Sequence, residues 1–379
     1  MVVPAEEYRR RVARVQEQAI AEGFGGLIFY SRPIWQFGGN VRYLSGLYVG
    51  TRREYLVIPA AGEPILILPT RNSINNARKV TWIEDIRAAG ETTEIFVDVV
   101  SGTVAELGFD TGRIGVVGMN DLMPAGDYRG LIEAMPEAEL VDATHIIDEM
   151  RLTKSEYEIA AIEETAGIAD DCYDLVRDFL REGVNERDLI ARCHGFLAGR
   201  GCTDLFLLTA RGRQFNGYID PPRDFTFSSG DNYIFSLEVA GPQRHWTQIV
   251  RPMTIGPGVS NSFRELHDIA MEGLASGVAA FKAGNRVGDI ANAIEDKVRA
   301  FDCQTNHWSG HGMGLDVAEA PAISPDNDMI IRPGMVLTIH PLISRRGDKS
   351  AGTFVGDTYV LEAAGPRNLS RWPCSLDIV

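Results

Sequence analysis

The sequence contains few cysteines, and those present follow no recognisable pattern. Five cysteines are scattered along 379 residues without any Cys-x-x-Cys pair, so no disulfide framework is expected. An odd number of unpatterned cysteines fits a reducing compartment, and we predict a cytoplasmic protein. The five are Cys172, Cys193, Cys202, Cys303 and Cys374.

Three further absences narrow the class of protein. No run of about 18 apolar residues is present, so no membrane-spanning helix is predicted. The charged, amphipathic start of the chain lacks the apolar core of a signal peptide. Neither a GxGxxG following a strand nor a GKS/T motif occurs, so we expect no nucleotide cofactor.

Positive charge is also in short supply. Lys and Arg number 37 against 52 Asp and Glu, which gives a formal net charge of -15. This balance argues against nucleic acid as the main partner. A hydrophobic fraction of 45% with 23% charged residues is that of a globular protein with a large core. The length predicts two domains.

The first 150 residues predict an α/β domain. Helical and strand patterns alternate here, which favours helices packed on a sheet. Ser155 and Glu158 form a capping box at the start of a long helix, and the polar segment Asp148–Ser155 precedes it. We therefore place the domains at 1–150 and 151–379. The expected elements are helices at 6–21, 71–79, 94–107 and 127–134, and strands at 27–30, 55–59, 64–68, 113–117 and 139–141. Ala60-Ala61-Gly62 favours a hairpin between the strands at 55–59 and 64–68.

The second domain contains an internal duplication. Gly183, Asp188 and Leu189 recur as Gly284, Asp289 and Ile290, each 101 residues later (284 − 183 = 101). Each copy follows a long helix (155–180 and 261–281) and precedes a strand (233–240 and 335–343). Two copies of one unit usually pack about a pseudo-twofold axis, so equivalent positions should converge on one cleft.

The duplicated strands carry the main candidate residues. Side chains alternate faces along a strand, so Glu238 lies on the face of Ser236, and His340 on that of Thr338. The opposite faces are apolar and should pack on helices. A glutamate at the centre of a strand is rarely tolerated unless it is paired or functional, and the same reasoning applies to His340.

A third candidate lies in the segment NHWSGHGMGLDVAEAP, Asn306–Pro321. Gly310, Gly312 and Gly314 surround His311, and such a glycine run lets backbone approach a ligand closely. A glycine-rich turn carrying an incidental histidine is the alternative, because a glycine triplet is a weak signal. The strand with His340 follows shortly after.

These motifs resemble those of the creatinase, aminopeptidase P and prolidase superfamily over essentially the whole chain. The resemblance implies a smaller α/β N-terminal domain followed by a pseudo-twofold α+β "pita-bread" catalytic domain. It also implies a homodimer in which the N-terminal domain of one subunit covers the site of the other. The matching stretches are NVRYLSG (40–46), MRLTKSEYEI (150–159), GHGMGLDVAEAP (310–321) and RPGMVLTIHP (332–341).

The chain departs from the peptidases of this superfamily at their metal ligands. Those enzymes bind two metal ions through two aspartates, a histidine and two glutamates. The resemblance places these ligands at Glu238, Gln248, His311, His340 and Gly356. Paired divalent ions need several carboxylates, so no metal is expected. Ala318 stands where the peptidases have a second active-site histidine.

The expected function is therefore that of the metal-free, creatinase-like branch: hydrolysis of a C–N bond in a small, carboxylate-bearing substrate. Creatine itself is not expected, because Val250 and Val355 stand where creatinase has its guanidinium-binding glutamates. Histidine suits proton transfer, so the expected catalytic residues are His311, Glu238 and His340. A pair of arginines can hold a carboxylate, so Arg52 and Arg53 are expected to bind the substrate. The other residues expected to line the substrate site are Gln248, His245, His307 and Asp357.

Four alternatives remain open. The same groups could catalyse a β-elimination, as in a lyase. Glu238, His311, His340 and Asp357 could hold a single metal ion. The chain could also be a metal-dependent Xaa-Pro peptidase, or a binding module without catalysis.

Overall fold

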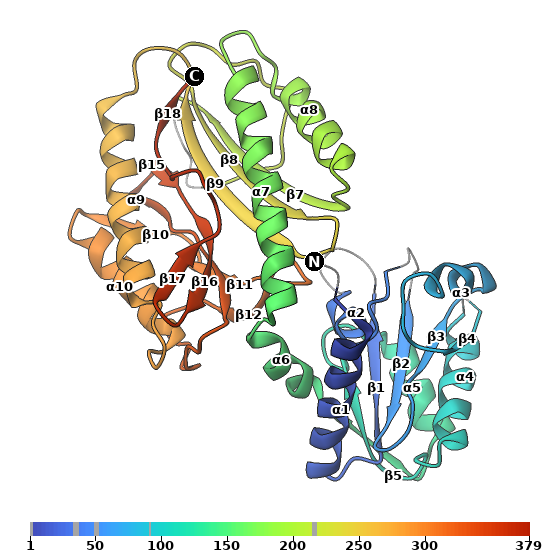
Figure 1. Cartoon of the computed structure of the whole chain (residues 1–379). Coiled ribbons are helices and arrows are strands. Elements are labelled where there is room, and N and C mark those ends of the chain that lie inside the picture. The colour runs from blue at the N-terminus through green and yellow to red at the C-terminus, as the bar shows by residue number, and fades with distance from the viewer. Residues whose placement is uncertain (1–2, 33–37, 49–52, 91, 214–217) are drawn as a thin grey trace. The chain divides into compact units, whose positions relative to one another are not determined.

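The computed structural model describes residues 3–32, 38–48, 53–90, 92–213 and 218–379. The chain forms two compact units, Val2–Arg151 and Leu152–Val379, here called the N-terminal and C-terminal units (Figure 1). Within the described ranges, none of the helices has an apolar stretch long enough to cross a bilayer.

The N-terminal unit is a six-stranded mixed sheet in the order β4-β3-β2-β1-β5-β6. Helices α4 and α5 pack on one face through a core that includes Ile28, Val57 and Val100. The β2–β3 hairpin predicted from the sequence is confirmed, with Leu56 paired to Leu66. The strands are β1 (Gly26–Ser31), β2 (Glu54–Pro59), β3 (Ile65–Leu68), β4 (Asp85–Ala88), β5 (Gly112–Val117) and β6 (Ala138–Asp142). The helices are α1 (Ala5–Ala21), α2 (Gly39–Ser45), α3 (Arg71–Ala77), α4 (Thr93–Glu106) and α5 (Ala125–Ala134).

The helix α6 (Thr144–Leu152) corrects the expectation of a polar boundary segment. Its Ile146, Ile147 and Met150 are buried, so the helix has an apolar face and continues into the polar segment that begins at Asp148. The capping box of Ser155 and Glu158 then starts α7 (Glu156–Phe179), as predicted.

The C-terminal unit contains three sheets, ordered β18-β9-β8-β7, β12-β11-β13-β16-β17 and β10-β14-β15. Its remaining helices are α8 (Glu186–Gly199), α9 (Asn261–Ala280) and α10 (Val287–Arg299). The first strands are β7 (Asp204–Gly212), β8 (Asn232–Ala240), β9 (Trp246–Thr254), β10 (Cys303–Thr305), β11 (Gly310–Gly312) and β12 (Glu319–Ala322). The others are β13 (Val336–Ile339), β14 (Leu342–Arg345), β15 (Asp348–Phe354), β16 (Asp357–Glu362), β17 (Gly365–Asn368) and β18 (Asp377–Ile378).

The internal duplication is visible in the helix starts. Gly183 and Gly284 both have positive φ, 82° and 90°, and α8 and α10 begin three residues after them. The residues capping these helices, Asn185 and Arg286, both form isolated bridges to an extended segment. The 101-residue offset therefore corresponds to two copies of one local structure.

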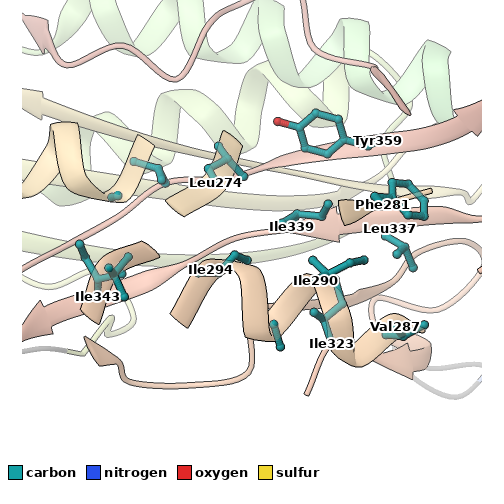
Figure 2. Packing of buried hydrophobic residues seen from close by; sticks show 14 of the residues in the cluster. Leu274, Phe281, Val287, Ile290, Ile294, Ile323, Leu337, Ile339, Ile343 and Tyr359 are labelled. Atoms are coloured by element: carbon teal, nitrogen blue, oxygen red, sulfur yellow. The ribbon is translucent and has the colours of Figure 1, made fainter. Parts of the chain in front are cut away.

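Apolar strand faces pack on the helices in both halves, as the alternation predicted. Tyr233, Phe235 and Leu237 of β8 lie in a core with α7 and α8. Leu337 and Ile339 of β13 lie in a second core with α9 and α10 (Figure 2). The polar faces of β8 and β13 are thereby left for the candidate site.

One predicted strand is wrong in extent. The sequence favoured a single strand over 335–343, but β13 ends at Ile339 and β14 begins at Leu342, in another sheet. Pro341 lacks the amide hydrogen that a continuous ladder needs. His340 consequently lies at the break between the two sheets.

Candidate active site

A chain of hydrogen bonds joins the polar faces of the two halves. Glu238 on β8 is paired in register with Gln248 on β9, and the Gln248 Nε2 donates to Glu238 Oε1 at 3.2 Å. The Gln248 Oε1 accepts from Thr338 Oγ1 of β13 at 3.0 Å. The amide of Gln248 therefore fixes the Glu238 carboxyl relative to the second half of the unit.

The two candidate histidines lie in ring contact. His311 on β11 is paired with Thr338, and His340 lies two residues beyond Thr338, on the same face. The centroids of the two imidazoles are 5.3 Å apart. Two residues along a strand span about 7 Å, so the imidazoles lie next to the Glu238–Gln248–Thr338 chain.

Two aromatic residues that sequence reasoning missed extend this contact. The ring centroid of Trp308 lies 5.3 Å from that of His311, and the Phe354 ring lies 5.3 Å from His340. Trp308 is 37% exposed, whereas His340 is 5% exposed, so the row of rings runs from the surface inward. The position of Trp308 three residues before His311 was the only signal available in the sequence.

The glycines around His311 are required by the packing of β11 between β12 and β13. A Cβ at Gly310, where φ is 141°, would lie 2.0 Å from the carbonyl oxygen of Thr338. A Cβ at Gly312 would lie 2.2 Å from that of Ala320. Side chains cannot be accommodated at either position, so the Gly-His-Gly run presents a single side chain, His311.

Burial makes the three titratable groups electrically neutral near pH 7. Burial raises the pKa of Glu238 to about 8, and this carboxyl has no ion-pair partner among the described residues. Burial lowers the pKa of His311 to about 4, against a smaller opposing effect of the hydrogen bond to Gly312. The pKa of His340 falls well below its ordinary value because of burial and, secondarily, His311.

The tautomer of neutral His311 follows from its one hydrogen bond. Nδ1 lies 2.9 Å from the carbonyl oxygen of Gly312, and a carbonyl can only accept, so Nδ1 carries the proton. Nε2 then carries the lone pair. In His340, by contrast, the buried Nδ1 has no hydrogen-bond partner in the described part of the chain.

The structure places Asp357 away from this group. Ile339 is the register partner of Asp357, so the Asp357 side chain lies on the face opposite Thr338 and His340. Its carboxylate pairs with Arg251 at 2.6 Å and accepts from Asn368 and Cys374. A single-metal site of Glu238, His311, His340 and Asp357 therefore cannot form in this arrangement.

The remaining predicted residues lie at or beyond the edge of the group. His307 is in ring contact with Trp308, with centroids 5.2 Å apart, and its proximity contributes to lowering the pKa of His311. His245 is buried near the start of α7, with Nε2 4.0 Å from Glu158. Within the described part of the chain, no hydrogen bond or ion pair joins His245 to Glu238 or His311.

The predicted arginine pair belongs to the N-terminal unit. Arg52 falls outside the described residues. Arg53 donates to both carboxylate oxygens of Asp127 at 3.1 Å and lies over the ring of Phe96. Arg53 thus has a structural ion pair, and its role as a substrate ligand stays a prediction.

Comparison with known proteins identifies the family of this chain. The sequence pattern of Metallopeptidase family M24 matches residues 160–363, and that of the Creatinase/Prolidase N-terminal domain matches 11–153. The chain belongs to Metallopeptidase family M24. By family it is a hydrolase of the creatinase and M24 type.

The relatives span nearly the full chain at low identity. The uncharacterized peptidase YqhT of Bacillus subtilis is 26% identical, covering 90% of this chain and 93% of its own length. The creatinase of a Bacillus species is 26% identical, with 97% and 91% covered. A solved Xaa-Pro dipeptidase of Bacillus anthracis shares the fold, with a TM-score of 0.85 at 23% identity, covering 98% and 100%.

The residues of this M24 chain do not fit a pair of metal ions. The five positions inferred from the superfamily hold one carboxyl, one amide, two imidazoles and Gly356. A side chain at Gly356 has no room, because its Cβ would lie 2.5 Å from that of His340. Among the described residues, no group of three or more His, Cys, Asp or Glu is placed to hold a metal ion.

This crowding predicts the effect of a small substitution. We expect Gly356→Ala to lower the free energy of unfolding by about 1–3 kcal/mol, the usual cost of overpacking, as measured by urea denaturation. Gly167→Ala in α7 is the matched control, because its Cβ meets nothing within 4 Å and helix propensity favours alanine. Equal stability of the two variants would show that His340 can move away from position 356.

The raised pKa of Glu238 predicts a pH-dependent stability difference. Between pH 4.5 and 8 the unfolded chain has released this proton and the folded chain retains it, so stability falls as pH rises through this range. Glu238→Gln lacks that loss. The difference in free energy of unfolding between Glu238→Gln and the wild type should therefore increase in favour of the variant, by roughly 3–5 kcal/mol from pH 4.5 to pH 9.

Urea denaturation at pH 4.5, 7 and 9 measures this difference. The contributions of the buried histidines to stability are lost as pH falls below 6.5. They are the same in both proteins, so they cancel in the difference. Exposed Glu137→Gln is the control and should show no such trend. A pH-independent difference for Glu238→Gln would mean that Glu238 is already ionised at neutral pH.

Proposed function

We propose that this protein is a metal-independent, creatinase-like hydrolase that cleaves a C–N bond in a small, carboxylate-bearing substrate. The observation that carries the proposal is the donor set at the M24 metal positions. One carboxyl without a second beside it cannot balance two divalent ions, and Gly356 has no room for the missing ligand.

In this proposal His311 is the principal acid/base. Its Nε2 lone pair takes a proton from the attacking water, and the imidazolium so formed gives that proton to the leaving nitrogen. A ring whose pKa is near 4 is unprotonated before the reaction, so it begins as the base. His340 is the second proton carrier, and Glu238 orients one of the histidines and raises its pKa, or holds a cationic group of the substrate.

We also propose the setting of this reaction. The protein would be a cytoplasmic homodimer in which Arg52 or Arg53 of one N-terminal unit binds the substrate carboxylate in the neighbouring site. The support is that all five cysteines are free thiols and that the N-terminal unit resembles that of creatinase.

A metal assay tests the proposal directly. The purified protein should contain well under one divalent ion per chain and retain its activity after dialysis against a chelator. The activity is found by screening small C–N substrates together with Xaa-Pro dipeptides, because the relatives include an Xaa-Pro dipeptidase. Incorporation of ¹⁸O from labelled water identifies hydrolysis, and an alkene product would identify a lyase instead.

A requirement for metal would contradict the proposal. Stoichiometric manganese, zinc or iron that restores turnover after chelation would overturn the metal-independent mechanism. Cleavage of Xaa-Pro dipeptides under those conditions would establish the peptidase alternative. Absence of any turnover across the screen would favour a binding module.

A further inference from the structure

Trp308 lies where the row of aromatic rings meets the surface. The row runs through His307, Trp308, His311, His340 and Phe354, and neighbouring ring centroids are 5.2 or 5.3 Å apart. The exposed fraction falls from 37% at Trp308 to 4% at His311 and 5% at His340. The indole is therefore the largest ring of the row that a small molecule can reach from solvent.

Backbone hydrogen bonds on both sides hold Trp308 in place. The Asn306 amide donates to the carbonyl oxygen of Leu342 at 2.9 Å. The Ser309 carbonyl oxygen accepts from the His340 amide, also at 2.9 Å. Because the chain is fixed before and after Trp308, the indole is preorganised beside the imidazoles, which lowers the entropic cost of binding a ligand there.

The orientation of the indole leaves part of its surface open. Its plane is tilted by 39° from that of His311 and by 73° from that of His307. Neither contact is a parallel stack, so neither imidazole covers an indole face completely. A flat ring can lie against the open part, and such an aromatic pair is stabilised beyond the effect of area burial alone.

The buried end of the row is apolar as well. Phe354, whose ring contacts His340, belongs to a cluster with Ile234, Val250 and Leu342. Apolar side chains thus lie at both ends of the row, with the polar chain of Glu238 and its partners between them. Small-molecule sites are commonly built in this way, from apolar walls and a few placed polar groups.

The polar residues between these ends have no cationic partner. In the described part of the chain, no lysine or arginine forms a hydrogen bond or ion pair with Glu238, Gln248, His311 or His340. An anionic group of the substrate therefore finds no cation here. The affinity of the C-terminal unit for a substrate has to come largely from apolar contact.

We infer that Trp308 is a specificity-determining residue whose indole binds an aromatic ring of the substrate, attached close to the scissile C–N bond. The inference rests on the proposed hydrolase function and names its substrate class, a carboxylate-bearing amide with an aryl group. The ring centroid of Trp308 lies 5.3 Å from that of His311, the proposed base. At about 1.5 Å per bond, a ring stacked on Trp308 lies within about four bonds of the carbon that water attacks.

Three N-acylglycines test the assignment by binding alone. N-benzoylglycine, N-cyclohexanecarbonylglycine and N-acetylglycine share a carboxylate and an amide C–N bond and differ in the acyl group. Each is titrated against the full chain by ligand-observed NMR at matched ionic strength. Wild-type protein should bind N-benzoylglycine at least ~10-fold more tightly than N-acetylglycine. It should also prefer the benzoyl to the cyclohexane ring by about 2–10-fold, because only the flat ring can stack on the indole.

Variants show whether this preference depends on Trp308. Trp308→Ala should reduce the preference for N-benzoylglycine over N-acetylglycine to within about twofold, whereas Trp308→Phe, which keeps a flat ring, should retain most of it. Phe301→Ala is the matched control and should retain all of it. Phe301 is similarly exposed, at 39%, and its ring lies beside Lys297 of α10.

Fluorinated tryptophan gives a second reading that needs no alanine variant. The chain contains five tryptophans, and the ¹⁹F resonance absent from Trp308→Phe is that of Trp308. N-benzoylglycine should shift this resonance more than the others. Equal or undetectable binding of the three probes by wild type, a preference that survives Trp308→Ala, or a shift confined to other tryptophans would overturn the assignment of Trp308. Metal-dependent turnover with the preference intact would instead overturn the proposed mechanism alone.

Discussion

Replacing His311 by alanine is expected to lower kcat by about 10²–10⁴-fold, the usual contribution of a positioned acid/base. His311→Gln should be nearly as impaired, because glutamine keeps a hydrogen bond to Gly312 but cannot carry a proton. Folding should survive in both, since His311 contacts other rings and not the apolar cores. Thermal melts and turnover of the substrate found in the screen provide the measurements.

A control variant and the pH dependence of kcat/KM test this prediction further. His194→Ala on the exposed side of α8 should leave kcat unchanged. A His311 pKa near 4 places the acid limb of kcat/KM near pH 4, well below the ordinary value for histidine. If His311→Gln keeps most activity, His340 becomes the leading acid/base. If His311→Ala unfolds the chain, the imidazole is a structural element of the glycine-rich turn.

Arg251→Met is expected to lower the free energy of unfolding by about 3–5 kcal/mol, because it leaves the Asp357 carboxylate buried without a cationic partner. Arg251 is fully buried. It donates to Asp357 and to the carbonyl oxygens of Val250 and Gly356. These bonds join β9 to the segment beside His340, so activity should fall together with stability.

Urea denaturation of three variants tests this. Arg286→Met removes exposed pairs with Asp289 and Asp328 and should cost less than about 1 kcal/mol. The double variant Arg251→Met/Asp357→Asn should recover part of the loss, because the unpaired charge is gone. A cost below about 1 kcal/mol for Arg251→Met alone would show that the buried pair contributes little.

The sequence predicted the elements that local patterns determine. The capping box of Ser155, the β2–β3 hairpin and the apolar faces of β8 and β13 all depend on residues a few positions apart. Short elements were missed: α2, β4 and α6 lack strong periodicity, and α2 has no side-chain cap at its start. Their formation depends on tertiary contacts such as that of the Tyr43 hydroxyl with the carbonyl oxygen of Met150.

Only the part of the candidate site that follows from strand alternation and the internal duplication was predictable from the sequence. Alternation and the internal duplication placed Glu238, Thr338 and His340 on polar faces, and the structure brings the imidazoles of His311 and His340 together. Alternation would have excluded Asp357 from the site only if its pairing with Ile339 had been known. That register depends on strand pairing, which no local pattern encodes. The lowered pKa of His311 follows from burial by distant segments, which the sequence does not specify.

The attachment of the segment 370–378 has a consequence for how the protein is made. Ser370 bonds to Asp170 and Arg251, Tyr173 donates to Asp377, and β18 pairs in parallel with β9. These contacts join residues separated by 119 to 204 positions. During synthesis the N-terminal unit can fold once Arg151 has emerged, because domains fold as units. The C-terminal unit, in contrast, must wait with its apolar strands exposed until its last strand is made, which makes this interval the period of greatest dependence on chaperones.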